Sequence, residues 1–514
     1  MIKNFKWLFL VSLTFVACNN DEVEVISNSS DGKVLTAGTA DFTKFIALGN
    51  SLTAGYSDSA LFIEGQKGSY PNILSQQFAL VGGGQFKTPF MADNIGGFVG
   101  IPGFGPRLFF NGAGPAPVPG TPSTNAATVL TGGFNNLGVP GAKSFHLVAA
   151  GYGNIAGLAT GQANPYFVRF ASSPATSIIV DAVAQNATFF SLWIGNNDVL
   201  GYATSGGVGA NQTGNTNPAT YGSNDITDPG VFASVYNSLI TALTAKGAKG
   251  VVANLPYVTS VPYFTTVPTN AVPGLPPASA AQLNQLFGGI NAALAASSLP
   301  ARFVTLVADD GNSATIETNA LLIKDESLIN ISGAITAALT PSFGAATAGI
   351  LGNLYGQARH ASNSVATRDY IVLPARTVIG TPQIGATAPF NTIGVSFPMQ
   401  DSTTLTASET AEVKIATDAY NAAIRSIATA KGLAFVDANA VLTQVASGGI
   451  TANGYTVSST YVSGGGFSMD GVHPSPRGYA LIANQFLAAI NTTYGSNLKA
   501  VDLSKYRILF TPVL

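Results

Sequence analysis

Short apolar runs alternate along the chain with longer segments that have helical spacing. Four apolar runs end at polar or glycine-containing turns and predict buried strands: Phe45–Leu48, Ala187–Ile194, Gly250–Leu255 and Ala434–Val436. Three segments carry apolar residues three and four positions apart and predict helices: Ser279–Ser298, Glu409–Lys431 and Gly478–Tyr494. Buried strands that alternate with helices are typical of a parallel sheet covered on both faces, so the pattern predicts an α/β sandwich.

Three long stretches exceed what such a sandwich needs. They are rich in glycine and proline or low in complexity, and they span about 82–133, 201–228 and 265–404. We predict a single, monomeric domain over residues 39–514 that carries these stretches as insertions. An independent middle domain at about 300–400 is the alternative.

The composition indicates a folded chain with few charges on its surface. Hydrophobic residues make up 46% and charged residues only 9%, with a net charge of −2. The hydrophobic fraction is too high for a disordered chain. Without a basic block, nucleic acid is excluded as a partner.

The N-terminus has the pattern of an export signal. Lys3 and Lys6 precede the short apolar core Trp7–Val16, which is followed by Cys18, the only cysteine of the chain. A single cysteine excludes disulfides and cysteine-rich zinc sites. The segment resembles a bacterial lipoprotein signal peptide (residues 1–17), which implies lipidation of Cys18 and a flexible tether over 18–38. The implied location is the envelope of a Gram-negative bacterium, anchored by lipid to the outer membrane. A buried or chance cysteine is the alternative.

Two motifs at opposite ends of the chain supply the groups of a serine hydrolase. Ser51 follows the first predicted strand and lies between Gly49 and Gly55, which allow a sharp turn. Asp470 precedes His473 by three residues, so its carboxylate can reach one ring nitrogen while the other faces a serine. Taken alone, the first motif reads as a helix cap and the second as an exposed loop histidine.

Two further segments offer hydrogen-bond donors at predicted strand ends. Asn197 follows the run Ala187–Ile194, and Gly141 offers an unhindered backbone N–H group. A serine that attacks an ester creates an oxyanion, which needs fixed donors of this kind. Asparagine and glycine are also common in ordinary turns, so each segment is informative only together with the others.

In this order the motifs resemble the blocks of the SGNH, or GDSL-type, serine hydrolases. The matching residues are the serine, glycine, asparagine, aspartate and histidine at Ser51, Gly141, Asn197, Asp470 and His473, and Leu255-Pro256 resembles a weaker block. The resemblance covers roughly 40–80, 134–200, 248–265 and 405–492. It implies a flavodoxin-like three-layer α/β/α sandwich with the site at the C-terminal edge of the sheet.

The resemblance also implies an activity: hydrolysis of carboxylic esters by an esterase, lipase or acylhydrolase, without metal or cofactor. Ser51 would be the nucleophile, His473 the base and Asp470 its partner. The N–H groups of Ser51 and Gly141 and the side chain of Asn197 would hold the oxyanion. The ester could be a lipid, a small molecule or an acylated glycan.

One residue departs from the family pattern, because Asn50 stands where the family usually carries aspartate. This departure and the inserted sequence motivate an alternative function: a non-catalytic glycan- or lipid-binding envelope lipoprotein on the same scaffold. The other two histidines lack partners at metal-ligand spacing. We interpret His146 as a structural or pocket-wall residue and His360 as a loop residue.

Overall fold

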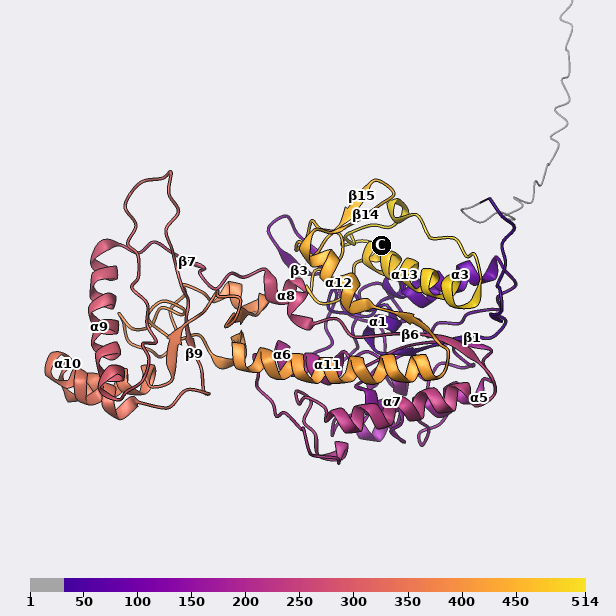
Figure 1. Ribbon diagram of the computed structural model, residues 1–514, viewed down its shortest axis with the longest axis horizontal. Coiled ribbons are helices and arrows are strands. Elements are labelled where there is room, and N and C mark those ends of the chain that lie inside the picture. Colours follow the sequence, from indigo (N-terminus) through magenta and orange to yellow (C-terminus); the bar gives the residue numbers. More distant parts are fainter. Residues whose placement is uncertain (1–31) are drawn as a thin grey trace, which may run out of the picture.

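A five-stranded parallel sheet with helices on both faces forms the centre of the computed structural model, which describes residues 32–514 (Figure 1). The strands are β1 (Phe45–Gly49), β4 (Asn136–Gly138), β5 (Phe189–Trp193), β6 (Lys249–Ala253) and β13 (Ala434–Val436). The four predicted strands and the parallel sheet are confirmed, and β4 is an addition to them. The predicted signal peptide, Cys18 and the first part of the tether lie outside the described residues.

The strand order in the sheet decides where a ligand can bind. The order is β13-β6-β5-β1-β4, which is 2-1-3-4-5 from the other edge when the five strands are counted along the chain. In such doubly wound sheets, ligands bind outside the carboxyl ends of the strands, where the order reverses. Here the reversal lies between β1 and β5, and Gly49 pairs with both Gly138 and Trp193. The segments that leave these strand ends therefore converge.

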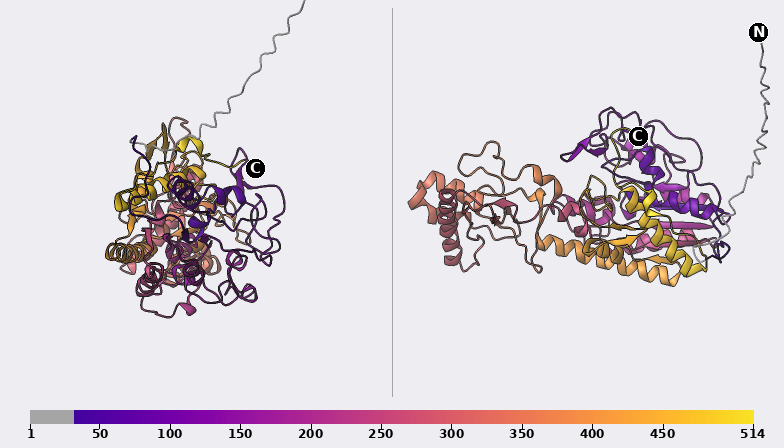
Figure 2. Two further views of the ribbon diagram at one scale, coloured as in Figure 1. Left: turned by 90° about the vertical axis from the view of Figure 1, so that its right-hand side faces the viewer. Right: turned by 90° about the horizontal axis from the view of Figure 1, so that it is seen from above.

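Two layers of helices enclose the sheet (Figures 1 and 2). One layer contains α3 (Tyr70–Ala79) and α13 (Pro476–Tyr494), and the other contains α5 (Ile178–Ala184), α7 (Pro229–Thr244) and α11 (Ala407–Ala430). The start of α11 is a capping box, in which the Thr406 N–H group donates to Glu409 at 2.7 Å. Helix α13 buries an apolar stripe, with Phe486 stacked on Tyr70 of α3 at 4.7 Å between ring centroids. The predicted helices are thus confirmed, with small shifts at their ends.

The segment 265–404 builds a lobe that extends from one end of the sandwich (Figures 1 and 2). It contains α9 (Pro277–Ala296), α10 (Ser332–Tyr355) and the antiparallel pair β9 (Leu322–Lys324) and β10 (Ala358–His360). The lobe has a hydrophobic cluster of its own, while Leu321 and Met399 at its base belong to the core of the sandwich. Helix α10 is long and apolar enough to cross a membrane by length and composition alone, and 22% of its apolar window is buried.

The other inserted stretches are loops on the sandwich. Residues 82–133 contain the short pair β2 (Leu108–Phe110) and β3 (Pro115–Pro117), and Phe98 packs against Tyr166 in a small separate cluster. The remaining strands are β7 (Val272–Pro273), β8 (Thr318–Asn319), β11 (Tyr370–Ile371), β12 (Thr404–Leu405), β14 (Ile450–Ala452) and β15 (Tyr455–Val457). The remaining helices are α1 (Ser51–Ala54), α2 (Ile63–Lys67), α4 (Pro165–Val168), α6 (Asn197–Thr204), α8 (Pro262–Thr265) and α12 (Ala438–Ser447).

The interpretation of His360 as a loop residue is wrong. It ends strand β10, is 6% exposed, and its Nδ1 atom accepts a hydrogen bond from the Val304 N–H group at 2.9 Å. Burial lowers the pKa of His360 to about 4, so it is a neutral core residue of the lobe. His146 is structural, as interpreted: it stacks on Tyr152 at 4.5 Å, and burial lowers its pKa to about 4.

Candidate active site

The turn after β1 places Ser51 at the edge of the sheet. Ser51 is the first residue of the single-turn helix α1, and Asn50 caps this helix by accepting the Leu52 N–H group at 3.0 Å. Helix α1 ends at Ala54, and the next residue, Gly55, caps it with a left-handed φ of 86°. A Cβ atom on Gly55 would lie 2.7 Å from the Gly65 carbonyl oxygen, and one on Gly49 would collide with Thr53 and the end of β5. Both glycines are therefore needed for this turn.

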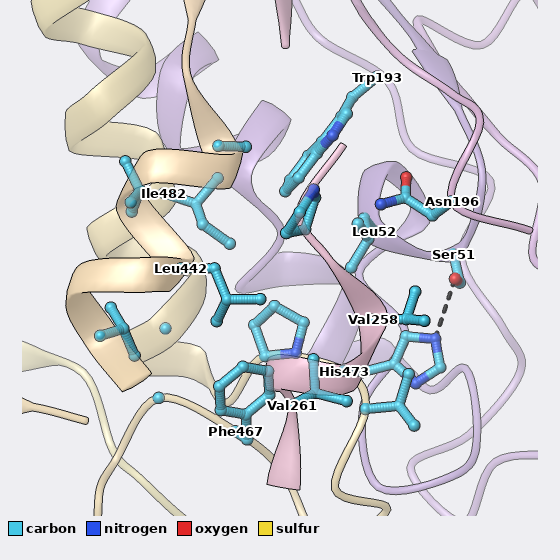
Figure 3. A pocket seen from close by; sticks show the side chains of 18 of the residues that line it. Ser51, Leu52, Trp193, Asn196, Val258, Val261, Leu442, Phe467, His473 and Ile482 are labelled. Carbon is cyan, nitrogen blue, oxygen red and sulfur yellow. Dashed lines mark hydrogen bonds between the residues drawn. The ribbon is translucent and has the colours of Figure 1, made fainter. Parts of the chain in front are cut away.

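The structure brings Ser51, His473 and Asp470 together in one hydrogen-bonded series, and Figure 3 shows its contact between Ser51 and His473. The Ser51 Oγ atom lies 2.9 Å from Nε2 of His473, and Nδ1 of His473 lies 2.9 Å from Oδ2 of Asp470. The other oxygen of Asp470 accepts the N–H groups of Val472 and His473 at 2.9 and 2.8 Å. The turn before α13 thus fixes the carboxylate and the imidazole. The serine that they meet comes from a segment near the other end of the sequence.

The electrostatics of Asp470 suit a partner of a histidine. Burial alone would raise its pKa, but the neighbouring His473 and the hydrogen bonds from His473 and Val472 lower the pKa to about 2. The carboxylate is therefore ionised at neutral pH. It can hold a proton on Nδ1 of His473 and stabilise a positive charge on the ring.

A loop just after Ser51 also supports this series, although no motif in the sequence indicates it. The Ser59 N–H group donates to Oδ2 of Asp470 at 2.9 Å, and the Ser468 hydroxyl donates to Oδ1 at 3.1 Å. The ring of Tyr56 packs on that of His473, with 4.6 Å between centroids. Ser59 has a φ of 63°, which is uncommon for a residue other than glycine. Its nearness to Ser51 in the sequence is the only signal that could have identified it.

Asp58 holds the same loop against the segment that carries Asp470. Its N–H group donates to the Ser468 hydroxyl at 2.9 Å, and its carboxyl accepts the Met469 N–H group at 2.8 Å. Burial raises the pKa of Asp58 to about 7, and the Asp470 carboxylate adds to this rise. Partial protonation at neutral pH limits the negative charge that faces Asp470.

The segments that follow the neighbouring strands β1, β4 and β5 carry three hydrogen-bond donors, at Ser51, Gly141 and Asn197. Asn197 is the first residue of α6, and its side-chain amide donates to the Ala142 carbonyl at 2.9 Å, which fixes it beside Gly141. Gly141 has a left-handed φ of 81°. Within residues 32–514, the backbone N–H groups of Ser51 and Gly141 donate no hydrogen bond, so both are available to a substrate oxygen. The second hydrogen of the Asn197 amide is the third donor.

Buried polar contacts fix the loop that carries Gly141. The backbone N–H group and the hydroxyl of Ser144 donate to the Asp198 carboxylate at 2.8 and 2.7 Å. The Asn164 side chain donates to the Pro140 carbonyl at 2.8 Å. Asp198 belongs to the same helix as Asn197, so these contacts hold the loop and the helix in one arrangement. Asp198 was not singled out as a site residue in the sequence.

Asn50, the departure from the family pattern, has two structural contacts. It is fully buried, and in addition to capping α1 it donates through Nδ2 to Oδ1 of Asn196 at 3.2 Å. Asn196 directly precedes Asn197. Asn50 thus connects the turn of Ser51 to the segment of the third donor.

An apolar cavity of about 120 Å³ opens beside Ser51 (Figure 3). Ser51 and His473 lie at one end, and Leu442 and Ile482 of helices α12 and α13 lie at the other. Apolar side chains form most of the wall between these ends: Leu52, Trp193, Val258, Val261, Val445 and Phe467. The cavity begins at the serine hydroxyl and is open to an apolar ligand.

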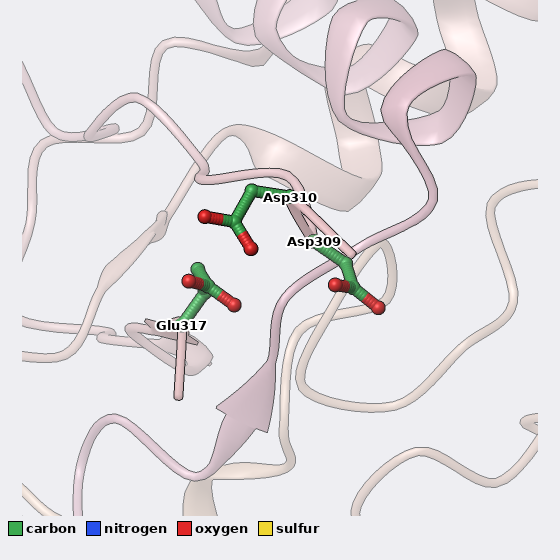
Figure 4. Close-up of side chains that lie close together, drawn as sticks. All are labelled: Asp309, Asp310 and Glu317. Carbon is green, nitrogen blue, oxygen red and sulfur yellow. The ribbon is translucent and has the colours of Figure 1, made fainter. Parts of the chain in front are cut away.

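Among the described residues, two groups of three carboxylates are close enough to hold a cation. Asp309, Asp310 and Glu317 lie together on a loop of the lobe, with both aspartates exposed (Figure 4). The other group, Glu326, Asp401 and Glu409, joins the lobe to α11. Burial and the neighbouring Glu326 raise the pKa of Asp401 to about 7 and that of Glu409 to about 8, so this group retains protons near neutral pH. Neither group lines the Ser51 cavity.

Comparison with known proteins gives a distant structural likeness. No protein-family model and no curated protein matches the chain. Among solved structures, the chain is similar to LAE5, described as an alpha/beta hydrolase enzyme from the metagenome of Lake Arreo, Spain. The two share 9% identity and a TM-score of 0.33, over 88% of this chain and 96% of that one. We therefore infer function from the geometry of this chain alone.

Proposed function

We propose that the protein is a serine hydrolase of the SGNH type that cleaves carboxylic esters through an acyl-enzyme intermediate. The observation that carries the proposal is the series Ser51–His473–Asp470, with two contacts of 2.9 Å. The backbone N–H groups of Ser51 and Gly141, which have no partner among residues 32–514, add to it. The flavodoxin-like strand order and the position of Ser51 and Asn197 at its reversal point support the same function.

In the first half of the reaction, the Ser51 oxygen attacks the ester carbonyl carbon while Nε2 of His473 takes the serine proton. The Asp470 carboxylate stabilises the imidazolium that forms. The carbonyl oxygen becomes an oxyanion, which accepts hydrogen bonds from the N–H groups of Ser51 and Gly141 and from the Asn197 amide. These donors bind the oxyanion more strongly than the neutral carbonyl and so lower the barrier.

The tetrahedral intermediate then expels the alcohol, whose oxygen takes the proton from Nε2 of His473, and this completes the first half. The acyl group stays on Ser51 as an ester. In the second half, water attacks this ester while Nε2 of His473 accepts a proton from the water. His473 then gives this proton to the Ser51 oxygen as the bond between that oxygen and the acyl carbon breaks, and the carboxylic acid leaves. One histidine therefore serves as base and acid in both halves, which requires that its ring keep the orientation set by Asp470.

The direct test is covalent labelling of the full chain by a fluorophosphonate probe, followed by mapping of the modified peptide. We expect modification at Ser51, together with turnover of short p-nitrophenyl esters. A non-catalytic binding protein would give the opposite result: tight glycan or lipid binding, no labelling and no turnover.

The Asn50→Asp variant tests the departure from the family pattern. An aspartate can still accept the Leu52 N–H group, and rotation of the Asn196 amide by 180° supplies a donor to its second oxygen. We expect kcat/KM for a p-nitrophenyl ester within about tenfold of wild type, because no group in the reaction path is lost. Asn50→Ala is the matched control, since it removes the cap and should lower stability by about 1 kcal/mol. A loss beyond about a hundredfold in Asn50→Asp, with Tm unchanged, would assign the amide a direct role.

We also propose that the protein is anchored to the outer membrane through lipid on Cys18. The proposal is based on the placement of this cysteine directly after a charged and apolar N-terminal segment. Cells that express the full chain should incorporate labelled palmitate into the protein, and Cys18→Ala should abolish the incorporation. Equal labelling of both proteins would contradict the anchor.

A further inference from the structure

We infer that the cavity beside Ser51 binds the acyl chain of the substrate and that the chain is of medium length, on the order of six carbons. The inference rests on the proposed function and narrows it to esters of medium-chain carboxylic acids. It excludes an acetylated glycan as the preferred substrate.

The chemistry of the cavity wall favours a hydrocarbon over a sugar. His473 is the only ionisable residue among the described residues that line it. The indole N–H group of Trp193 is already engaged, because it donates to the Asn254 carbonyl at 3.0 Å. The other polar side chains of the wall, Ser51, Asn196 and Asn197, belong to the catalytic end, and the remaining lining residues are apolar. A sugar that extended beyond this end would lose the hydrogen bonds of its hydroxyls to water without replacement, whereas an acyl chain would only gain apolar contacts.

The volume of the cavity sets the length of the chain. A dry apolar cavity of about 150 Å³ in another protein accommodates benzene, which has six carbons. The cavity here has about 120 Å³ and extends from Ser51 towards Leu442 and Ile482 (Figure 3). By proportion, a chain of about five carbons beyond the ester carbonyl, as in a hexanoyl group, fills it, and longer chains must protrude past these two residues.

The reaction itself decides which half of the ester occupies the cavity. The alcohol oxygen must receive its proton from Nε2 of His473, and water must then take the place of that alcohol. The alcohol side must therefore be open to water. The acyl group, by contrast, remains bonded to Ser51 through both halves and benefits from a wall that holds it in place. An apolar cavity that starts at the serine can hold the acyl group, but it does not provide the open access to water that the alcohol side needs.

The first experiment compares two ester series with the full chain. In one series the alcohol is p-nitrophenol and the acyl group grows from acetyl to palmitoyl. We expect kcat/KM to rise about fourfold for each methylene up to about hexanoyl, and then to level off or fall. In the other series the acyl group is acetyl and the alcohol grows. Here we expect little change, and a rise confined to this series would overturn the inference by placing the alcohol in the cavity.

Variants at the far end of the cavity test whether it is the site that binds the acyl chain. Leu442→Trp should shorten the cavity and lower the ratio of hexanoyl to acetyl turnover at least tenfold. Leu442→Ala should lengthen it and move the optimum towards octanoyl or decanoyl esters. Ala446→Trp is the matched control, because Ala446 is exposed on the same helix and does not line the cavity. A ratio that is equal in all four proteins would overturn the inference even if the enzyme is active.

A binding experiment separates this inference from the proposed function. In the full chain with Trp7→Phe and Ser51→Ala, Trp193 is the only tryptophan and lines the cavity. Octanoate should change the fluorescence of Trp193 along a saturable curve and at a lower concentration than acetate does. Leu442→Trp is not used in this experiment because it adds a second indole. Saturable octanoate binding without fluorophosphonate labelling of the Ser51 protein would leave the cavity supported and the hydrolase refuted. Turnover of acetyl esters without octanoate binding would support the hydrolase and refute the acyl-binding cavity.

Discussion

The Ser51→Ala variant is expected to lose between about 10⁴ and 10⁶ in kcat for a hexanoyl ester. Its alanine has no oxygen to form the acyl-enzyme, so the remaining rate comes from water attack at the oxyanion donors. The backbone N–H group at position 51 is retained, as are Gly141 and Asn197, and binding should therefore change little. The measurement is steady-state turnover beside a thermal melt of the same preparation.

Two controls make this result interpretable. Ser234→Ala makes the same chemical change at an exposed position of α7 and should retain wild-type turnover. Ser51→Ala with His473→Ala should be no slower than Ser51→Ala alone, because both residues act in the same step. If Ser51→Ala alone retains more than about a hundredth of wild-type activity at unchanged Tm, Ser51 is not the nucleophile.

The core strands could be read from the sequence because they are buried on both faces. All five residues of β1 and all five of β5 are buried, which explains why the sequence is predominantly apolar over both strands. The edge strand β4 is only Asn136-Leu137-Gly138, and its sequence is that of a turn. It belongs to the sheet because it pairs with β1, and no pattern in its own sequence indicates this pairing.

The lobe formed by residues 265–404 was harder to read for a different reason. Helix α10 is apolar on most sides and is interrupted by Pro341 and by Gly344 at a φ of 74°, so its sequence shows no clear helical period. The apolar face of α9 was visible, but a periodic pattern does not tell which surface the face will meet. That face packs within the lobe and not on the sheet. The separate hydrophobic cluster of the lobe therefore depends on tertiary packing, which the sequence pattern does not show.

The candidate site shows a similar division. Motif order alone selected Ser51, Gly141, Asn197, Asp470 and His473, and the fold places all five at one sheet edge. The support from Ser59 depends on a left-handed backbone at a residue that is not glycine, which the sequence does not reveal. The cavity wall comes from several separate segments whose apolar residues look like ordinary core positions. The motifs thus indicated which residues would meet, while the shape and lining of the cavity could be described only from the structure.

The Asp470→Asn variant is expected to lose about 10⁴ in kcat while its fold is retained. The side-chain oxygen of the asparagine can still accept hydrogen bonds from the N–H groups of Val472 and His473. Its NH₂ group then faces Nδ1 of His473. That amide donates to Nδ1 and so places the ring proton on Nε2. In this tautomer His473 cannot accept the proton of Ser51. An exposed carboxylate of the lobe offers the matched control, since Asp310→Asn should leave turnover unchanged.

A second measurement on Asp470→Asn distinguishes loss of the charge from loss of the fold. The pKa of Asp470 is lowered from 3.8 to about 2, so the folded state binds its proton less tightly than the unfolded state does. This carboxylate therefore stabilises the fold above about pH 4, and the contribution is lost as the pH falls towards 2. Between pH 7 and pH 3, Tm should fall less in Asp470→Asn than in wild type. If turnover falls only a few-fold while this difference in Tm appears, Asp470 supports the fold of the turn and is dispensable for orienting His473.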